Sequence, residues 1–136
     1  MITRGTTPYH SFILPFKAED INNLYVTYFQ NNNLVLEKTL SEAEELINID
    51  DLYENASMNE VCGAIRFPTQ PEEEEGSVCQ VTFHLTQEDT LKFKFFPAAE
   101  KNIAVIQIRV LTNDNEAYAS EPLRERVFGV LKEGVI

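Results

Sequence analysis

Apolar and polar residues alternate along most of this chain, and this two-residue period places successive side chains on opposite faces of a β-strand. In IAVIQIRVLT, for example, Ile106 and Ile108 share one face while Gln107 and Arg109 share the other. The stretch VCQVTFHLT repeats the pattern. Such strands at short, regular spacing predict an all-β fold, specifically an immunoglobulin-like antiparallel β-sandwich.

Turn residues separate these strands. Asn31, Asn32 and Asn33 tolerate positive φ and stand between NLYVTYFQ and LVLEKTL, which predicts a hairpin. A second turn is expected at residues 113–116, followed by a last strand that Pro122 interrupts. The alternation also predicts which side chains form the core. They are Phe12, Leu14, Val26, Tyr28, Leu36, Val81, Phe83, Leu85, Leu91, Phe93, Ile106, Ile108, Val110 and Val127.

Two further segments raise specific expectations. YHSFILPF is apolar and bounded by Pro8 and Pro15, which favours an edge strand because proline cannot donate to a ladder. HLTQEDTLKF begins as a strand and then turns polar. We expect Thr86 to cap a single helical turn there, with Leu91 and Phe93 returning to the core, at a corner where the chain passes from one sheet to the other.

The net charge of −11 is concentrated in one segment. Residues 40–76 contain eleven acids and one base, whereas the remaining chain is nearly neutral. Ser41 and Glu44 have the spacing of a capping box, which predicts one or two helical turns. The run of four glutamates that ends at Glu75 favours a solvated loop. We therefore expect one domain over residues 1–136, with 41–76 as an acidic, partly helical insertion between two strands.

The acidic segment is also the predicted docking site for a basic partner surface. The candidate residues are Glu42, Glu44, Glu45, Asp50, Asp51, Glu72, Glu73, Glu74 and Glu75. Nucleic acid is not expected as a partner, because its phosphates require basic stripes. A DxDxDG calcium spacing is missing around Asp50 and Asp51, so no metal is expected there.

The sequence offers no catalytic set, and we expect no enzyme activity and no cofactor. His10 adjoins Ser11, but neighbouring strand residues point to opposite faces, so the two do not form a nucleophilic pair. Cys62 and Cys79 lack zinc-ligand spacing. A single disulfide would require them to lie on neighbouring strands, and in a reducing cytoplasm we expect free buried thiols instead. No phosphate-binding glycine motif occurs among the five glycines.

Nothing in the sequence indicates a membrane protein. No apolar run approaches the roughly 18 residues of a membrane span. The first residues, MITRGTTPYHSF, do not have the layout of a signal peptide. The expected location is the cytoplasm in which the chain is made, or a larger particle that leaves it.

Several stretches together resemble a protein family. They are RGTTP (4–8), YVTYFQNNNLVLEKT (25–39), LTQEDTLKF (85–93), IQIRVLTNDNEAYAS (106–120) and a closing VFGVL (127–131). The set is similar to a group of small proteins of bacteriophages and prophages of gut-dwelling Firmicutes. Their layout resembles the N-terminal β-domain of phage baseplate upper proteins. The resemblance covers both ends of the chain and leaves out residues 41–76.

The resemblance implies a non-enzymatic virion structural or accessory protein of the baseplate, tail, neck or capsid. It would be present in the virion and, during assembly, in the host cytoplasm. Its partners would be other virion proteins and further copies of itself, and we expect the N-terminal ITRGTTP or the apolar C-terminal tail to pack on another subunit. Two alternatives are a host-glycan-binding attachment module, and a small phage protein that binds a basic host protein through the acidic segment.

Overall fold

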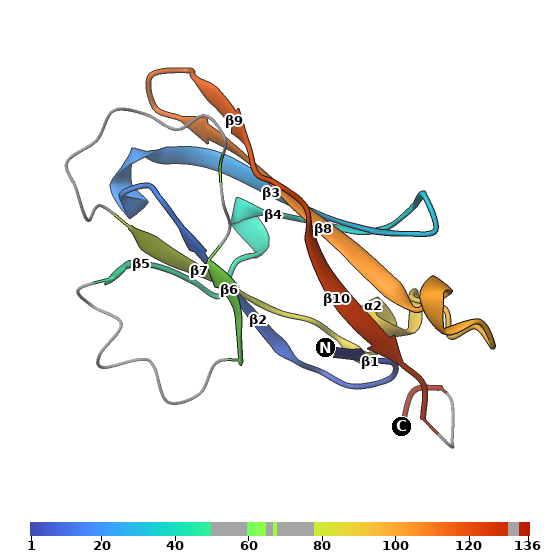
Figure 1. Ribbon diagram of the computed structural model, residues 1–136. Helices are drawn as coiled ribbons and strands as arrows, with labels where there is room; N and C mark the ends of the chain where they lie inside the picture. The colour runs from blue at the N-terminus through green and yellow to red at the C-terminus, as the bar shows by residue number, and fades with distance from the viewer. Residues whose placement is uncertain (50–59, 65–66, 68–77, 131–133) are drawn as a thin grey trace.

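The computed structural model describes residues 1–49, 60–64 (backbone only), 67, 78–130 and 134–136. Its strands form two β-sheets, so the predicted all-β class is confirmed (Figure 1). Within the described residues, the larger sheet has six strands. In order across the sheet they are β1 (Ile2–Thr3), β10 (Leu123–Phe128), β8 (Ile103–Thr112), β3 (Ile21–Gln30) and β4 (Asn33–Thr39), with β9 (Ala117–Ala119) also paired to β8.

The smaller sheet has four strands among the described residues. Their order is β5 (Glu45–Asn48), β7 (Cys79–His84), β2 (Tyr9–Leu14) and β6 (Glu60–Ala64). Two pairings are parallel, β1 with β10 and β2 with β6, whereas a purely antiparallel arrangement was predicted. Both parallel pairs join strands far apart in the sequence, so no hairpin signal could have indicated them.

The core lies between the two sheets and follows the alternation seen in the sequence. Leu24, Val26 and Tyr28 of β3 are fully buried, while Tyr25 and Phe29 on the opposite face are partly exposed. All fourteen predicted core residues are buried except Leu91, which is half-buried. The core also contains Cys79, which was expected to be buried, and residues that were not predicted: Ile2, Phe16, Ile21, Leu24, Phe67 and Ala104.

The hairpin and the polar corner were both predicted correctly. Asn31 and Asn32 have φ of 52° and 63°, the left-handed values that a two-residue hairpin turn needs. Thr86 caps α2 (Gln87–Leu91), because its hydroxyl accepts from the Asp89 amide and the Asp89 carboxylate accepts from the Thr86 amide. The chain arrives there from β7 of the smaller sheet and continues to β8 of the larger one. Phe93 returns to the core as expected, whereas Leu91 is the last residue of α2 and is only half-buried.

The edge position predicted for β2 was also wrong. This strand lies between β7 and β6 in the interior of its sheet. Pro8 and Pro15 fall outside its bounds, so neither proline removes a donor from either ladder. His10 to Ile13 pair with β6, a strand supplied by the acidic segment.

The acidic segment differs from the expected helical insertion. After the 3-10 turn η2 (Leu40–Glu42), the backbone is extended at Ala43 and enters β5, which pairs with β7. The cap also lies earlier than predicted, since the Thr39 amide donates to Glu42 at 3.1 Å. A helix this short is marginal alone, and pairing with β7 satisfies the backbone instead. The predicted extra strand in EVCGAIRF is present as β6.

The two ends of the chain lie on the same side of the molecule (Figure 1). Ile2 of β1 is fully buried and pairs with Val127 of β10 in the same chain. The N-terminal strand is therefore part of this chain's own core. Val135 and Ile136 of the C-terminal tail are exposed.

Candidate functional site

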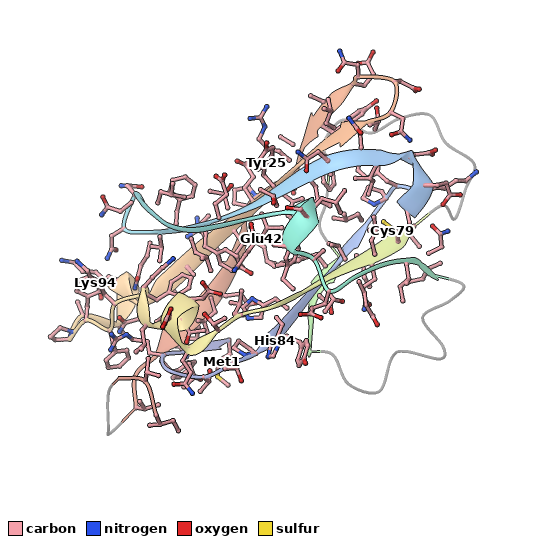
Figure 2. All side chains as sticks on the ribbon, turned by 180° about the vertical axis from the view of Figure 1, so that it is seen from behind. Met1, Tyr25, Glu42, Cys79, His84 and Lys94 are labelled. Carbon is pink, nitrogen blue, oxygen red and sulfur yellow. The ribbon has the colours of Figure 1, made fainter. Side chains whose placement is uncertain are left out.

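A groove of about 600 Å³ lies at the end of the larger sheet, beside the β3–β4 turn. Its lining includes Lys92, Lys94 and Lys101, together with Leu34 and Val35 of β4. We call it the lysine groove. Figure 2 shows Lys94 at the end of the molecule opposite Cys79.

Gln30, the last residue of β3, holds the backbone of the lysine-bearing loop. Its side chain is buried, and its Nε2 donates to the carbonyl of Lys94 at 2.6 Å and to that of Lys101 at 3.1 Å. Its Oε1 accepts from the Lys94 amide at 2.8 Å. One amide side chain therefore joins two backbone segments that carry lysines.

Asn102 makes a second connection of this kind. Its Oδ1 accepts from the Phe96 amide at 2.7 Å, and its Nδ2 donates to the Phe96 carbonyl at 2.9 Å. Buried amides are costly to leave unpaired, so these bonds resist rearrangement of the loop. The groove wall is thus ordered by the fold itself.

The groove is basic although the chain as a whole is strongly acidic. All three lysines are exposed, and no Asp or Glu is among the described residues that line the groove. Lys101 lies 5.8 Å from the centre of the Phe96 ring, within the range of a cation–π contact. Sequence reasoning missed this site. The available signal was the concentration of three of the chain's eleven basic residues within 92–101.

A second feature is the outer face of the larger sheet, which points away from the core. Tyr25 and Phe29 are 40% and 36% exposed there, and Val105, which pairs with Phe29, is half-buried. We call these three residues the outer-face strip. Arg109 pairs with Tyr25 across the ladder, and Arg124 pairs with Val105.

The outer-face strip is bordered by charges of both signs. A hollow of about 480 Å³ beside Phe29 is lined by Glu100 and Arg124, among other residues. A second hollow, beside Tyr25, is lined by Glu37 and Arg109. Apolar side chains surrounded by charges of both signs are typical of a protein contact surface.

The predicted docking acids are only partly described. Glu42 forms an ion pair with Lys38 at 3.5 Å, and Glu44 is exposed with its amide donating to the Thr82 carbonyl. Glu45, on β5, is half-buried and its Oε2 has no hydrogen-bond partner. The remaining candidates, Asp50, Asp51 and Glu72 to Glu75, lie outside the described residues.

The other reactive side chains are held in structural positions. His10 is buried in the core, where its Nδ1 lies 2.8 Å from the Tyr28 hydroxyl, and His84 stacks on Tyr9 with ring centres 4.0 Å apart. Cys79 is a free, buried thiol, as predicted, and burial raises its pKa to about 12. The Cys62 side chain is outside the described set.

Among the described residues, no group of three His, Cys, Asp or Glu side chains is arranged to hold a metal ion. The same part of the chain contains no helix with the length and apolar character needed to cross a membrane. Comparison of the chain with protein-family models, with curated proteins and with solved structures gave no significant match.

Proposed function

We propose that this protein is a non-enzymatic structural or accessory component of a bacteriophage particle and acts through contacts with other proteins. The sequence motifs that resemble small phage proteins support the particle assignment. The two sheets around one core support the immunoglobulin-like sandwich as its finer fold, although the two parallel pairings depart from a purely antiparallel version.

The observation that carries the protein-contact proposal is the outer-face strip. Tyr25 and Phe29 belong to β3, an interior strand of the larger sheet, so an edge position does not account for their exposure. Burying two aromatic rings on association releases water from apolar surface, which is the main driving force for protein contacts. The ordinary exposed face of an antiparallel sheet is polar instead.

The occupant that best fits the outer-face strip is a second copy of this chain. The strip carries Arg109 and Arg124, but also Glu37 and Glu100 in the same hollows. A surface with one sign of charge would repel its own copy. A surface with both signs can pair with itself about a two-fold axis, which is the commonest symmetry of protein dimers.

The test is sedimentation velocity of the wild type and of Phe29→Glu over a range of concentrations. We expect the wild type to dimerise and Phe29→Glu to shift toward monomer, because a buried unpaired carboxylate opposes the contact. Tyr9→Glu is the matched control, since it replaces another partly exposed aromatic residue, on β2 of the smaller sheet and outside the strip. Circular dichroism checks that each variant is folded.

A monomeric wild type, or equal dimerisation by Phe29→Glu, would contradict the contact proposal. The particle assignment has its own test, which is electron microscopy of purified particles with a labelled antibody to this protein. Absence of label from all particles would remove that part of the proposal.

A further inference from the structure

We propose that the lysine groove of one copy binds the glutamate run 72–75 of a second copy, giving a head-to-tail contact. This inference extends the protein contacts of the proposed function to a second surface. It differs from the outer-face contact because the two surfaces that meet are not the same. Such heterologous contacts join copies into rings or chains, depending on whether the rotation closes.

The lysine groove and the glutamate run carry opposite charges. The groove presents Lys92, Lys94 and Lys101 without a lining acid among the described residues. The nearby Asp89 is 3.0 Å from Lys38, so its charge is already paired. Glu100 lines the hollow beside Phe29 rather than the lysine groove. The lysine groove therefore attracts an acidic segment. The chain as a whole repels such a segment, because its net charge is −11.

The edge of β4 also suits a peptide ligand. Leu34 and Val35, which line the groove together with the lysines, belong to a strand that pairs only with β3 in the described part of the chain. An edge strand presents backbone donors and acceptors to an extended chain lying beside it. A polypeptide can use these groups and offer carboxylates to the lysines at the same time.

The same geometry favours a peptide over nucleic acid. Single-stranded nucleic acid binds through aromatic faces on which successive bases stack. The described lining of the groove contains one aromatic ring, Phe96, and Lys101 lies over it. A stacking platform is therefore missing from the lining, whereas charged side chains and a strand edge are present.

A glutamate run that binds the lysine groove has to come from another copy, because the chain is too short to reach its own groove. The glutamate run lies between two anchored residues, Phe67, which packs on Phe16, and Val78, whose carbonyl accepts from the Ile49 amide. Glu72 is five residues from Phe67 and Glu75 is three from Val78, so the chain reaches at most about 18 Å and 11 Å from these anchors.

The groove is farther away than that. Asn48 pairs with Cys79 and also binds the Ala18 amide, so this end of the smaller sheet adjoins the start of β3. Gln30, at the other end of β3, contacts Lys94 and Lys101. The ten residues of β3 span about 30 Å. Figure 2 places Cys79 and Lys94 at opposite ends of the molecule. The run of one copy therefore does not fill its own groove.

A charge exchange tests the contact in the full chain. All forms carry Phe29→Glu, so that the outer-face contact does not contribute. One variant has Lys92→Glu, Lys94→Glu and Lys101→Glu, and the other has all four residues 72–75 changed from Glu to Lys. Each variant alone should be monomeric by sedimentation, because its groove and its run carry the same sign. The mixture should associate, since each groove then meets a run of opposite charge.

A peptide measurement covers the case in which a charge-exchanged chain does not fold. The probe is the nine-residue peptide TQPEEEEGS, residues 69–77, and its control has glutamine in place of the four glutamates. We expect the glutamate peptide to bind the wild type about tenfold more tightly than it binds Lys92→Gln/Lys94→Gln/Lys101→Gln, as three exposed ion pairs allow. Binding should weaken with added salt, which screens exposed charges.

Three results of the charge-exchange and peptide experiments would overturn the inference. They are association of either charge-exchanged variant alone, a mixture of folded variants that stays monomeric, and equal binding of the peptide by the wild type and the triple glutamine variant. Inorganic polyphosphate is the competing probe. Binding of polyphosphate without binding of the peptide would also reject it. None of these outcomes bears on the outer-face contact, which the Phe29→Glu comparison tests separately.

Discussion

Acid should destabilise this protein through His10. The imidazole is almost completely buried in the core, and its Nε2 has no hydrogen-bond partner. Burial lowers the pKa of His10 from 6.5 to about 4, with a smaller contribution from the N-terminal amine. The folded state therefore keeps His10 neutral at pH values where the unfolded chain already binds a proton.

The sign and size of the effect follow from this pKa difference. A base whose pKa is lowered by folding contributes its full stability above pH 6.5 and loses it as the pH falls toward 4. One proton bound only by the unfolded state lowers the free energy of unfolding by about 1.4 kcal/mol per pH unit. Over this interval the loss is about 3 kcal/mol, a large part of the 5–15 kcal/mol typical of a folded domain.

The assay is urea unfolding at several pH values between 7.5 and about 4.5, an interval in which most of this loss is expected. His10→Gln removes the titrating group while leaving a polar partner for Tyr28, so its stability should change less with pH than that of the wild type. His84→Gln is the control, because His84 is exposed and stacks on Tyr9. Carboxylates contribute equally to all three proteins. An identical pH dependence in His10→Gln and the wild type would refute the reasoning.

Three further substitutions test the construction of the fold. Thr86→Ala removes the cap of α2 and should lower the free energy of unfolding by about 1 kcal/mol in urea titration, whereas Thr7→Ala, at an exposed site, should not. Gln30→Leu frees the lysine-bearing loop, so hydrogen exchange of the Lys94 amide should become faster while that of the Ile108 amide does not. Phe67→Ala should cost about 3–5 kcal/mol, because the ring is buried against Phe16. An unchanged free energy of unfolding in Phe67→Ala would show that this ring does not support the core.

The sequence by itself determined the features that depend on near neighbours. The alternation of β3 and β8 decided which side chains point inward, since a strand's side-chain period is two in any sheet. Asn31 and Asn32 decided the hairpin, because asparagine tolerates the left-handed backbone found there. The cap of α2 is likewise local, because Thr86 and Asp89, which form it, are three residues apart in the sequence.

The tertiary structure decided what depends on distant partners. Whether β2 is an edge strand depends on β6, which is distant in the sequence. His10 of β2, for example, pairs with Glu60 of β6, fifty residues later. Residues 45–48 form a strand rather than a helix because β7 offers a ladder. The lysine groove requires Gln30 to bond the backbone of Lys94 and Lys101. Local propensities differ by roughly 1 kcal/mol or less per residue, so backbone pairing and burial across the fold override them.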